Sequence, residues 1–237
     1  MSLSEKIRCR AYELGFDLCG IAACHPMSEH YEAFQKWLDA GYDGGLEHLH
    51  RNAEKRFDPT LLYEQARSVI VCGVSYHRPH ASGEVASRIA AYAHSVDYHI
   101  TIKQQLFRLL DYLKELKPEA AGRVFTDTAP ISEKSWAVEA GLGWIGRHSL
   151  LIHPRLGSFL LLGEIVTTVG LDPDNRKLPE VRGGLSGQGD SARPEDRRRK
   201  VYCPQDDRTG TGRKNGRGSA WMGFRLRRMS AGVSLQP

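Results

Sequence analysis

Asp127 is the side chain whose setting most clearly suggests chemistry. It follows the stretch 123–126, which reads as a strand, and precedes Thr128-Ala129-Pro130, so we expect it at the end of a strand and just before a helix. Catalytic groups often gather at the ends of strands, and a carboxyl group walled by aromatic residues would keep its proton and could donate it. The alternative is an ordinary cap of the following helix. The aromatic residues expected to form the wall are Phe125, Trp136 and Trp144.

Arg56 and the Asp97-Tyr98-His99 triplet are two further polar groups with possible functions. Arg56 stands before Phe57-Asp58-Pro59, and the triplet opens the clearest helical pattern of the chain. Either group could bind an anion or form hydrogen bonds in a site. Helix capping and surface charge explain both equally well.

The run GLGWIG, residues 141–146, matches the spacing of a dinucleotide-binding loop. That loop needs a strand before it and a helix after it, because the pyrophosphate lies on the helix N-terminus. Here a helix is expected before the glycines and a strand after them. We therefore interpret Gly141 as a left-handed helix cap and the other glycines as places where main chain approaches something flat, covered by Trp144.

The cysteines and histidines show no metal-binding spacing. The five cysteines are scattered, and neither Cys-x-x-Cys nor His-x-x-x-His occurs. We expect free thiols and no metal site in the chain.

The elements that must position these groups are of both kinds. Helices and strands alternate irregularly, and two apolar stretches joined by the turn 154–157 should pair as a hairpin. This favours an α+β layered sandwich with a mixed sheet flanked by helices over a doubly wound fold. Helices are expected at 4–15, 29–41, 101–117 and 131–141, and strands at 16–24, 68–76, 123–127, 148–153 and 158–168.

The chain of 237 residues changes character after residue 174. Residues 175–237 hold 15 of the 33 Lys and Arg but only 6 of the 28 Asp and Glu, so the basic character belongs to this segment and the body is mildly acidic. We expect a domain at 1–174 and a disordered Arg/Gly-rich tail at 175–237, which could bind RNA or could be a frameshifted end. No apolar run suggests membrane insertion or secretion, so a cytoplasmic, monomeric protein is expected.

Several motifs together resemble, in order and spacing, the cobalamin-binding domain of epoxyqueuosine reductases over about residues 1–174. They are Lys55-Arg56-Phe57-Asp58-Pro59, Tyr92-Ala93, Asp97-Tyr98-His99, Asp127-Thr128-Ala129-Pro130, Glu133-Lys134 and the block 140–165 around AGLGWIG.

The resemblance implies a fold like that of reductive dehalogenases and a defined reaction. The family reduces epoxyqueuosine to queuosine in tRNA anticodons, using cobalamin and two [4Fe-4S] clusters. Asp127 matches the proton donor. Residues matched to cobalamin contacts are Arg56, Tyr92, Leu151, His153 and Leu162.

One departure concerns the iron–sulfur clusters. The resemblance implies two sets of cluster cysteines after the last strand, whereas this sequence offers only Cys203 there. We therefore expect a truncated reductase that is inactive alone, with its electron donor unidentified. The alternatives are a corrinoid-binding module without catalysis and an RNA-binding protein acting through its basic tail.

Overall fold

The computed structural model describes residues 1–77, 89–94 and 96–174. Its centre is a four-stranded antiparallel sheet in the order β1-β2-β6-β3. The strands are β1 (Leu18–Ala23), β2 (Ser68–Ser75), β3 (Gly122–Phe125) and β6 (Leu160–Thr167). A separate pair consists of β4 (Trp144–Ile145) and β5 (Leu151–Ile152).

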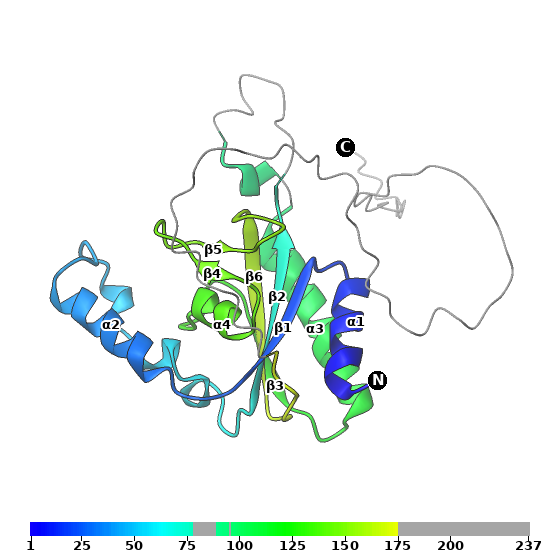
Figure 1. The fold of residues 1–237 in the computed structure, drawn as a ribbon. Coiled ribbons are helices and arrows are strands. Elements are labelled where there is room, and N and C mark those ends of the chain that lie inside the picture. The colour runs from blue at the N-terminus through cyan, green and yellow to red at the C-terminus, as the bar shows by residue number, and fades with distance from the viewer. Residues whose placement is uncertain (78–88, 95, 175–237) are drawn as a thin grey trace, which may run out of the picture. The chain divides into compact units, whose positions relative to one another are not determined.

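The helices form layers on both faces of the sheet (Figure 1). Two of them, α1 (Leu3–Glu13) and α3 (Tyr98–Leu116), pack on one face, and α4 (Glu133–Glu139) packs on the other. The chain also forms α2 (Ser28–Asp39) and short 3-10 turns, including η2 (Glu54–Arg56), η3 (Pro59–Leu61) and η5 (Ala91–His94). The α+β layered class is confirmed, and the sheet expected to be mixed is antiparallel in every pairing described.

Successive side chains of β2 point to opposite faces of the sheet, which explains why a hydrophobic core lies on each face. Val69 and Val71 face the α4 side, whereas Ile70 and Cys72 face α1 and α3, and all four are fully buried. A strand buried on both faces must be apolar at every position, which is why this stretch is continuous in β-branched residues. The prediction of a strand at 68–76 is confirmed, and this strand lies inside the sheet.

The predicted hairpin of the strands at 148–153 and 158–168 is wrong. β5 pairs with β4, while β6 pairs with β2 and β3. His153 and Gly157 exchange both backbone hydrogen bonds, at 3.0 and 2.9 Å, so the turn closes on itself. The apolar β6 then gains more by filling the centre of the main sheet than by pairing with the short β5.

Ser2 caps α1 and forms a capping box with Glu5. Cys19, Cys24 and Cys72 are free thiols, as expected.

The expected basic tail lies outside the described residues. This applies to residues 175–237, to Cys203 and to the RNA-binding alternative that rests on the tail. Among the described residues, no helix has the length and apolar character needed to span a bilayer.

Candidate active site

Asp127 lies two residues beyond the end of β3, in a tight turn. The Thr128 N–H donates a hydrogen bond to the Thr126 carbonyl over 2.5 Å, which makes Asp127 the central residue of a three-residue turn. Its φ is +54°, in the left-handed region that side chains other than glycine rarely adopt. Backbone strain of this kind persists only where the surroundings enforce it.

The Asp127 carboxylate is held by residues of the first turn of α3. Its Oδ2 lies 2.9 Å from His99 Nε2 and accepts a hydrogen bond from the Tyr98 hydroxyl over 3.3 Å. His99 Nδ1 lies 2.8 Å from Asp97 Oδ1. Asp97 is also the N-cap of α3, because the same oxygen accepts the His99 backbone N–H. The helix cap therefore fixes the imidazole that contacts Asp127.

Hydrogen bonds and charge shift the titration of these groups. The Asp127 and Asp97 carboxylates on either side of the ring raise the pKa of His99 above its usual range. Burial, with the nearby Asp127 charge, raises the pKa of Tyr98 to about 12. The hydrogen bonds from His99 lower the pKa of Asp97. An imidazolium bonded to two carboxylates is a proton donor placed directly on Asp127.

Glu133 holds Asp127 from the other side. Its Oε1 accepts the Asp127 backbone N–H over 2.6 Å. Burial, followed by the charge of Asp127, raises the pKa of Glu133 to about 7. The strained turn is thus fixed through its amide by α4 and through its carboxylate by α3.

The expected aromatic wall around the acid is wrong. Phe125 and Trp136 are buried in the core, Trp144 is half-buried, and the Asp127 side chain is 58% exposed. The reason is geometric, since Asp127 lies beyond β3 in a turn with a positive φ, and Trp136 lies on the buried side of α4.

A row of aromatic rings leads away from this cluster. Ring centroids are 5.5 Å apart for Phe159 and Tyr76, 6.3 Å for Tyr76 and Tyr92, and 6.2 Å for Tyr92 and Tyr98. Phe159 and Tyr92 are 44% and 47% exposed. Tyr92, predicted from sequence, is therefore brought next to the Asp127 cluster, and the row offers apolar, aromatic surface beside the acid.

The other predicted cofactor contacts are placed differently. Leu151 and Leu162 are buried in the core on the α4 side of the sheet. His153 is buried, its Nδ1 accepts the backbone N–H groups of Arg155 and Leu156, each over 3.2 Å, and burial lowers its pKa to about 4. These side chains stabilise the fold and do not converge on Asp127.

Arg56 borders the Asp127 loop through its backbone. Its carbonyl accepts the Ser132 N–H over 2.8 Å at the start of α4. Its Nη2 donates to the His48 carbonyl over 3.3 Å, while Nε is buried without a partner among the described residues. Burial lowers the pKa of the guanidinium. Arg56 thus has donor capacity that the described contacts do not use.

The glycine run is explained largely by the packing of the chain on itself. Gly141 has a φ of +71° after the end of α4, which confirms the predicted left-handed cap. A Cβ on Gly143 would lie 2.3 Å from the Ile152 carbonyl oxygen, so this glycine permits the pairing of β4 with β5. The flat group that Gly143 was expected to approach is therefore the neighbouring strand of the β4–β5 pair.

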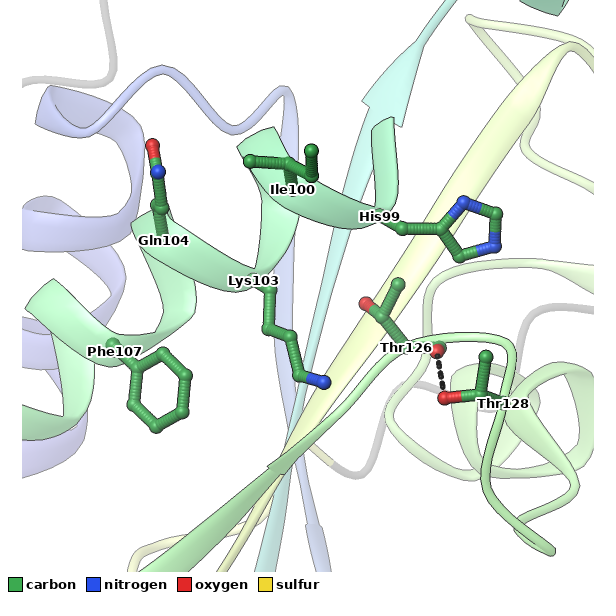
Figure 2. Close-up of a pocket in the computed structure, with 7 residues that line it drawn as sticks. All are labelled: His99, Ile100, Lys103, Gln104, Phe107, Thr126 and Thr128. Carbon is green, nitrogen blue, oxygen red and sulfur yellow. Dashed lines mark hydrogen bonds between the residues drawn. The ribbon is translucent and has the colours of Figure 1, made fainter. Parts of the chain in front are cut away.

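Two surface grooves flank the Asp127 turn on the side of β3. Figure 2 shows His99 and Lys103 extending from α3 toward the segment that carries Thr126 and Thr128. This groove of about 490 Å³ is lined by His99, Ile100, Lys103, Gln104, Phe107, Thr126 and Thr128. A neighbouring groove of about 380 Å³ adds Lys55 and Arg123 to Lys103. The surface beside the acid is therefore basic.

Sequence reasoning left Asp97, Tyr98 and His99 open between a role in a site and ordinary helix capping. It placed Glu133 in a motif and assigned it no role. Their sequence signal was present, whereas their convergence depends on tertiary structure. Within the described residues, no group of three or more His, Cys, Asp or Glu side chains could hold a metal ion.

Comparisons with known proteins give one consistent family. The family model "Epoxyqueuosine reductase QueG, DUF1730" matches residues 56–128. The epoxyqueuosine reductase of Cyclobacterium marinum is 40% identical over 74% of this chain and 58% of its own length. That of Cellulophaga algicola is 36% identical over 73% of this chain and 56% of its own length.

Solved structures agree on the fold. The epoxyqueuosine reductase of Streptococcus thermophilus matches with a TM-score of 0.63 and 26% identity over 71% of this chain and 46% of its own. A structure of epoxyqueuosine reductase with an epoxyqueuosine-modified tRNA stem loop matches with a TM-score of 0.62 and 24% identity, over 73% of this chain and 47% of its own.

A more distant match shows the fold alone. A reductive dehalogenase, whose structure suggests a mechanism for B12-dependent dehalogenation, matches with a TM-score of 0.51 and 19% identity over 76% of this chain and 21% of its own. The chain spans a little over half the length of the curated relatives named above. By the sequence and structural matches together, it resembles the epoxyqueuosine reductase family.

Proposed function

We propose that this chain carries the cobalamin-binding and proton-donating part of an epoxyqueuosine reductase, with Asp127 as the acid. The observation that carries the proposal is the cluster in which His99 and Tyr98 hold the Asp127 carboxylate next to an exposed aromatic row. A partly exposed acid with a protonated imidazole behind it suits proton delivery to a substrate oxygen.

The fit of cobalamin can be judged from the residues present. The exposed rings of Phe159 and Tyr92 offer apolar contact for a broad, flat group. The buried, unpartnered Nε of Arg56 suits an anionic or amide oxygen of a ligand's periphery. The buried side chains of Leu151, His153 and Leu162 do not fit direct contacts, so we propose Tyr92 and Arg56 as the contacts.

The chemistry assigned to this chain is proton transfer. Conversion of the epoxide to the alkene consumes two electrons and two protons and releases the oxygen as water. Bound cobalamin would supply the reducing metal centre. Asp127 would protonate the oxygen as its bond to carbon breaks, and His99 would return a proton to Asp127 through the 2.9 Å contact. Electrons are proposed to come from iron–sulfur clusters, as the family resemblance implies.

The substrate is proposed to be tRNA. A relative is known with an epoxyqueuosine-modified tRNA stem loop. On this chain, Lys55, Lys103 and Arg123 line the grooves beside the Asp127 turn, where they could contact phosphates.

The proposal is tested in two steps with the purified chain. Added hydroxocobalamin should show a shifted absorbance spectrum on binding, because the surroundings of the corrinoid change. With a chemical reductant such as titanium(III) citrate and epoxyqueuosine-containing tRNA, the chain should form queuosine. Asp127→Asn should keep the spectral shift and lower the reduction rate by about 100- to 10,000-fold, the usual effect of losing a general acid.

The matched control is Asp111→Asn on the exposed side of α3, which should leave both measurements unchanged. No spectral change at saturating cobalamin would contradict the proposed cofactor. An undiminished rate in Asp127→Asn would contradict the role of the acid.

A further inference from the structure

The buried carboxyl group of Glu164 is the feature of the core that the proposed chemistry leaves unexplained. Glu164 lies in the middle of β6, opposite Phe125 of β3, and is fully buried. Neither of its carboxyl oxygens has a hydrogen-bond partner among the described residues. An isolated buried carboxylate costs several kcal/mol, so the neutral acid is the stable form. Burial raises the pKa of Glu164 well above its usual range.

Glu164 lies on the same face of the sheet as α4, whose first residue is Glu133. Burial raises the pKa of Glu164 most, and the charge of Glu133 raises it further. Two carboxyls in one poorly solvated place do not both ionise readily. At neutral pH this pair therefore retains at least one proton.

Glu133 connects the buried pair to the acid. Its Oε1 accepts the Asp127 backbone N–H over 2.6 Å, and Asp127 is the residue with a φ of +54°. A charge-assisted hydrogen bond to that amide stabilises a turn that its local backbone preferences disfavour. The Asp127 carboxylate keeps its contacts with His99 and Tyr98 only while this turn is formed.

We propose that Glu133 is the positioning residue of Asp127, holding the strained turn through its amide, and that the buried Glu164 is the neighbouring group that stores a proton. A role of Glu133 in catalysis rests on the proposed function, whereas its positioning of the Asp127 turn does not. Glu133 acts through the Asp127 backbone and need not touch a substrate.

Several charged groups face Glu133 and must be considered in any pH effect. Burial has the largest effect and raises the pKa of Glu133. The hydrogen bond from the Asp127 backbone N–H lowers it, the charge of Asp127 raises it, and Lys134 and His99 lower it. Tyr98 on α3 also faces Glu133. The net result is a pKa of about 7. The carboxylate form of Glu133 holds the Asp127 amide, so this contact weakens as pH falls through about 7.

The first measurement is the amide resonance of Asp127 in the isotope-labelled chain. In the wild type its chemical shift should titrate with a midpoint near 7, as Glu133 gains or loses its proton. Glu133→Gln keeps an oxygen acceptor but cannot ionise, so it should abolish this titration. Glu133→Ala should speed exchange of the Asp127 amide at least tenfold. Glu139→Gln, at the exposed end of the same helix, is the control and should leave the titration unchanged.

The second measurement addresses Glu164 by infrared difference spectroscopy at neutral pH. The wild type should show the C=O stretch of a protonated carboxylic acid that Glu164→Gln lacks. Gln is also neutral, so Glu164→Gln should keep the spectrum of the folded chain. It should move the midpoint of the pH titration of the Asp127 amide resonance by no more than a few tenths of a pH unit.

Each result decides one part of the proposal. The positioning role is overturned if the Asp127 amide resonance does not change with pH in the wild type, or if it changes equally in Glu133→Gln. Absence of the protonated carboxyl band overturns the role of Glu164. Neither measurement needs cobalamin or tRNA, so they stand even if the chain reduces no epoxide. If the chain does reduce the epoxide, its rate should fall as pH drops below about 7, and Glu133→Gln should remove this fall. A purely structural effect would not remove it.

Discussion

His99 is held between two carboxylates, and its titration should report the geometry of the site. The hydrogen bond to Asp127 is the largest cause of its raised pKa, followed by the bond to Asp97. Asp127→Asn should therefore lower the pKa of His99 toward its ordinary value, and Asp97→Asn should lower it by a smaller amount. The measurement is a proton-NMR titration of the imidazole. A His99 pKa unchanged by Asp127→Asn would show that the contact does not form in solution.

The position of Asp127 could be predicted from sequence, whereas its partners could not. A strand pattern ending before an acid, followed by a proline and a helical pattern, is local information. The contact with His99 joins residues 28 positions apart and depends on where the first turn of α3 lies beside β3. The expected aromatic wall failed for the same reason, because the face on which Trp136 lies is set by the packing of α4.

At the scale of elements, the contact between α3 and β6 sets the position of the site. A Cβ on Gly163 would lie 2.6 Å from Thr126 Oγ1, 2.7 Å from Leu106 Cδ1 and 2.8 Å from Ile102 Cγ2. Gly163→Ala should push α3 away from the sheet and destabilise the chain by about 1–3 kcal/mol, as overpacked cores do. Urea denaturation measures this loss, and the His99 resonances should shift because His99 lies one turn before Ile102.

The control for this prediction is Gly73→Ala on the neighbouring strand. There the added Cβ would meet only side-chain atoms, at 3.3 Å or more, so a smaller loss of stability is expected. Equal stability of Gly163→Ala and wild type would mean that α3 does not pack on β6 as closely as described.

Strand identity could be predicted from composition, but strand pairing could not. A strand was predicted at 68–76, which is rich in β-branched residues, and the structure has β2 there. The hairpin of β5 with β6 was a reasonable inference from the turn between them. It failed because pairing depends on which edge of the main sheet is free for the long apolar β6, which is not a local property.

At the scale of the whole molecule, layered α+β architecture followed from the irregular alternation of helices and strands. The two cores, one on each face of the sheet, also make clear why a charged residue in β6 is exceptional. Glu164 is the one Asp or Glu with less than 1% exposure among the described residues. Its presence in a strand that is otherwise apolar could be seen in the sequence, but its burial required knowing that β6 is an interior strand.

The dependence of stability on pH should reveal this buried acid. A carboxyl group with a raised pKa in the folded chain stabilises it fully below the ordinary value of 4.5 and loses that contribution as pH rises through the folded pKa. The unfolding free energy of the wild type should therefore fall above pH 4.5, by up to about 1.4 kcal/mol per pH unit for each such group.

Glu164→Gln removes one such group, so its advantage in unfolding free energy over the wild type should grow as pH rises. Urea denaturation from pH 4.5 to 8 measures the difference, with Glu139→Gln expected to follow the wild type. Parallel curves for wild type and Glu164→Gln would mean that Glu164 is not held as a buried neutral acid.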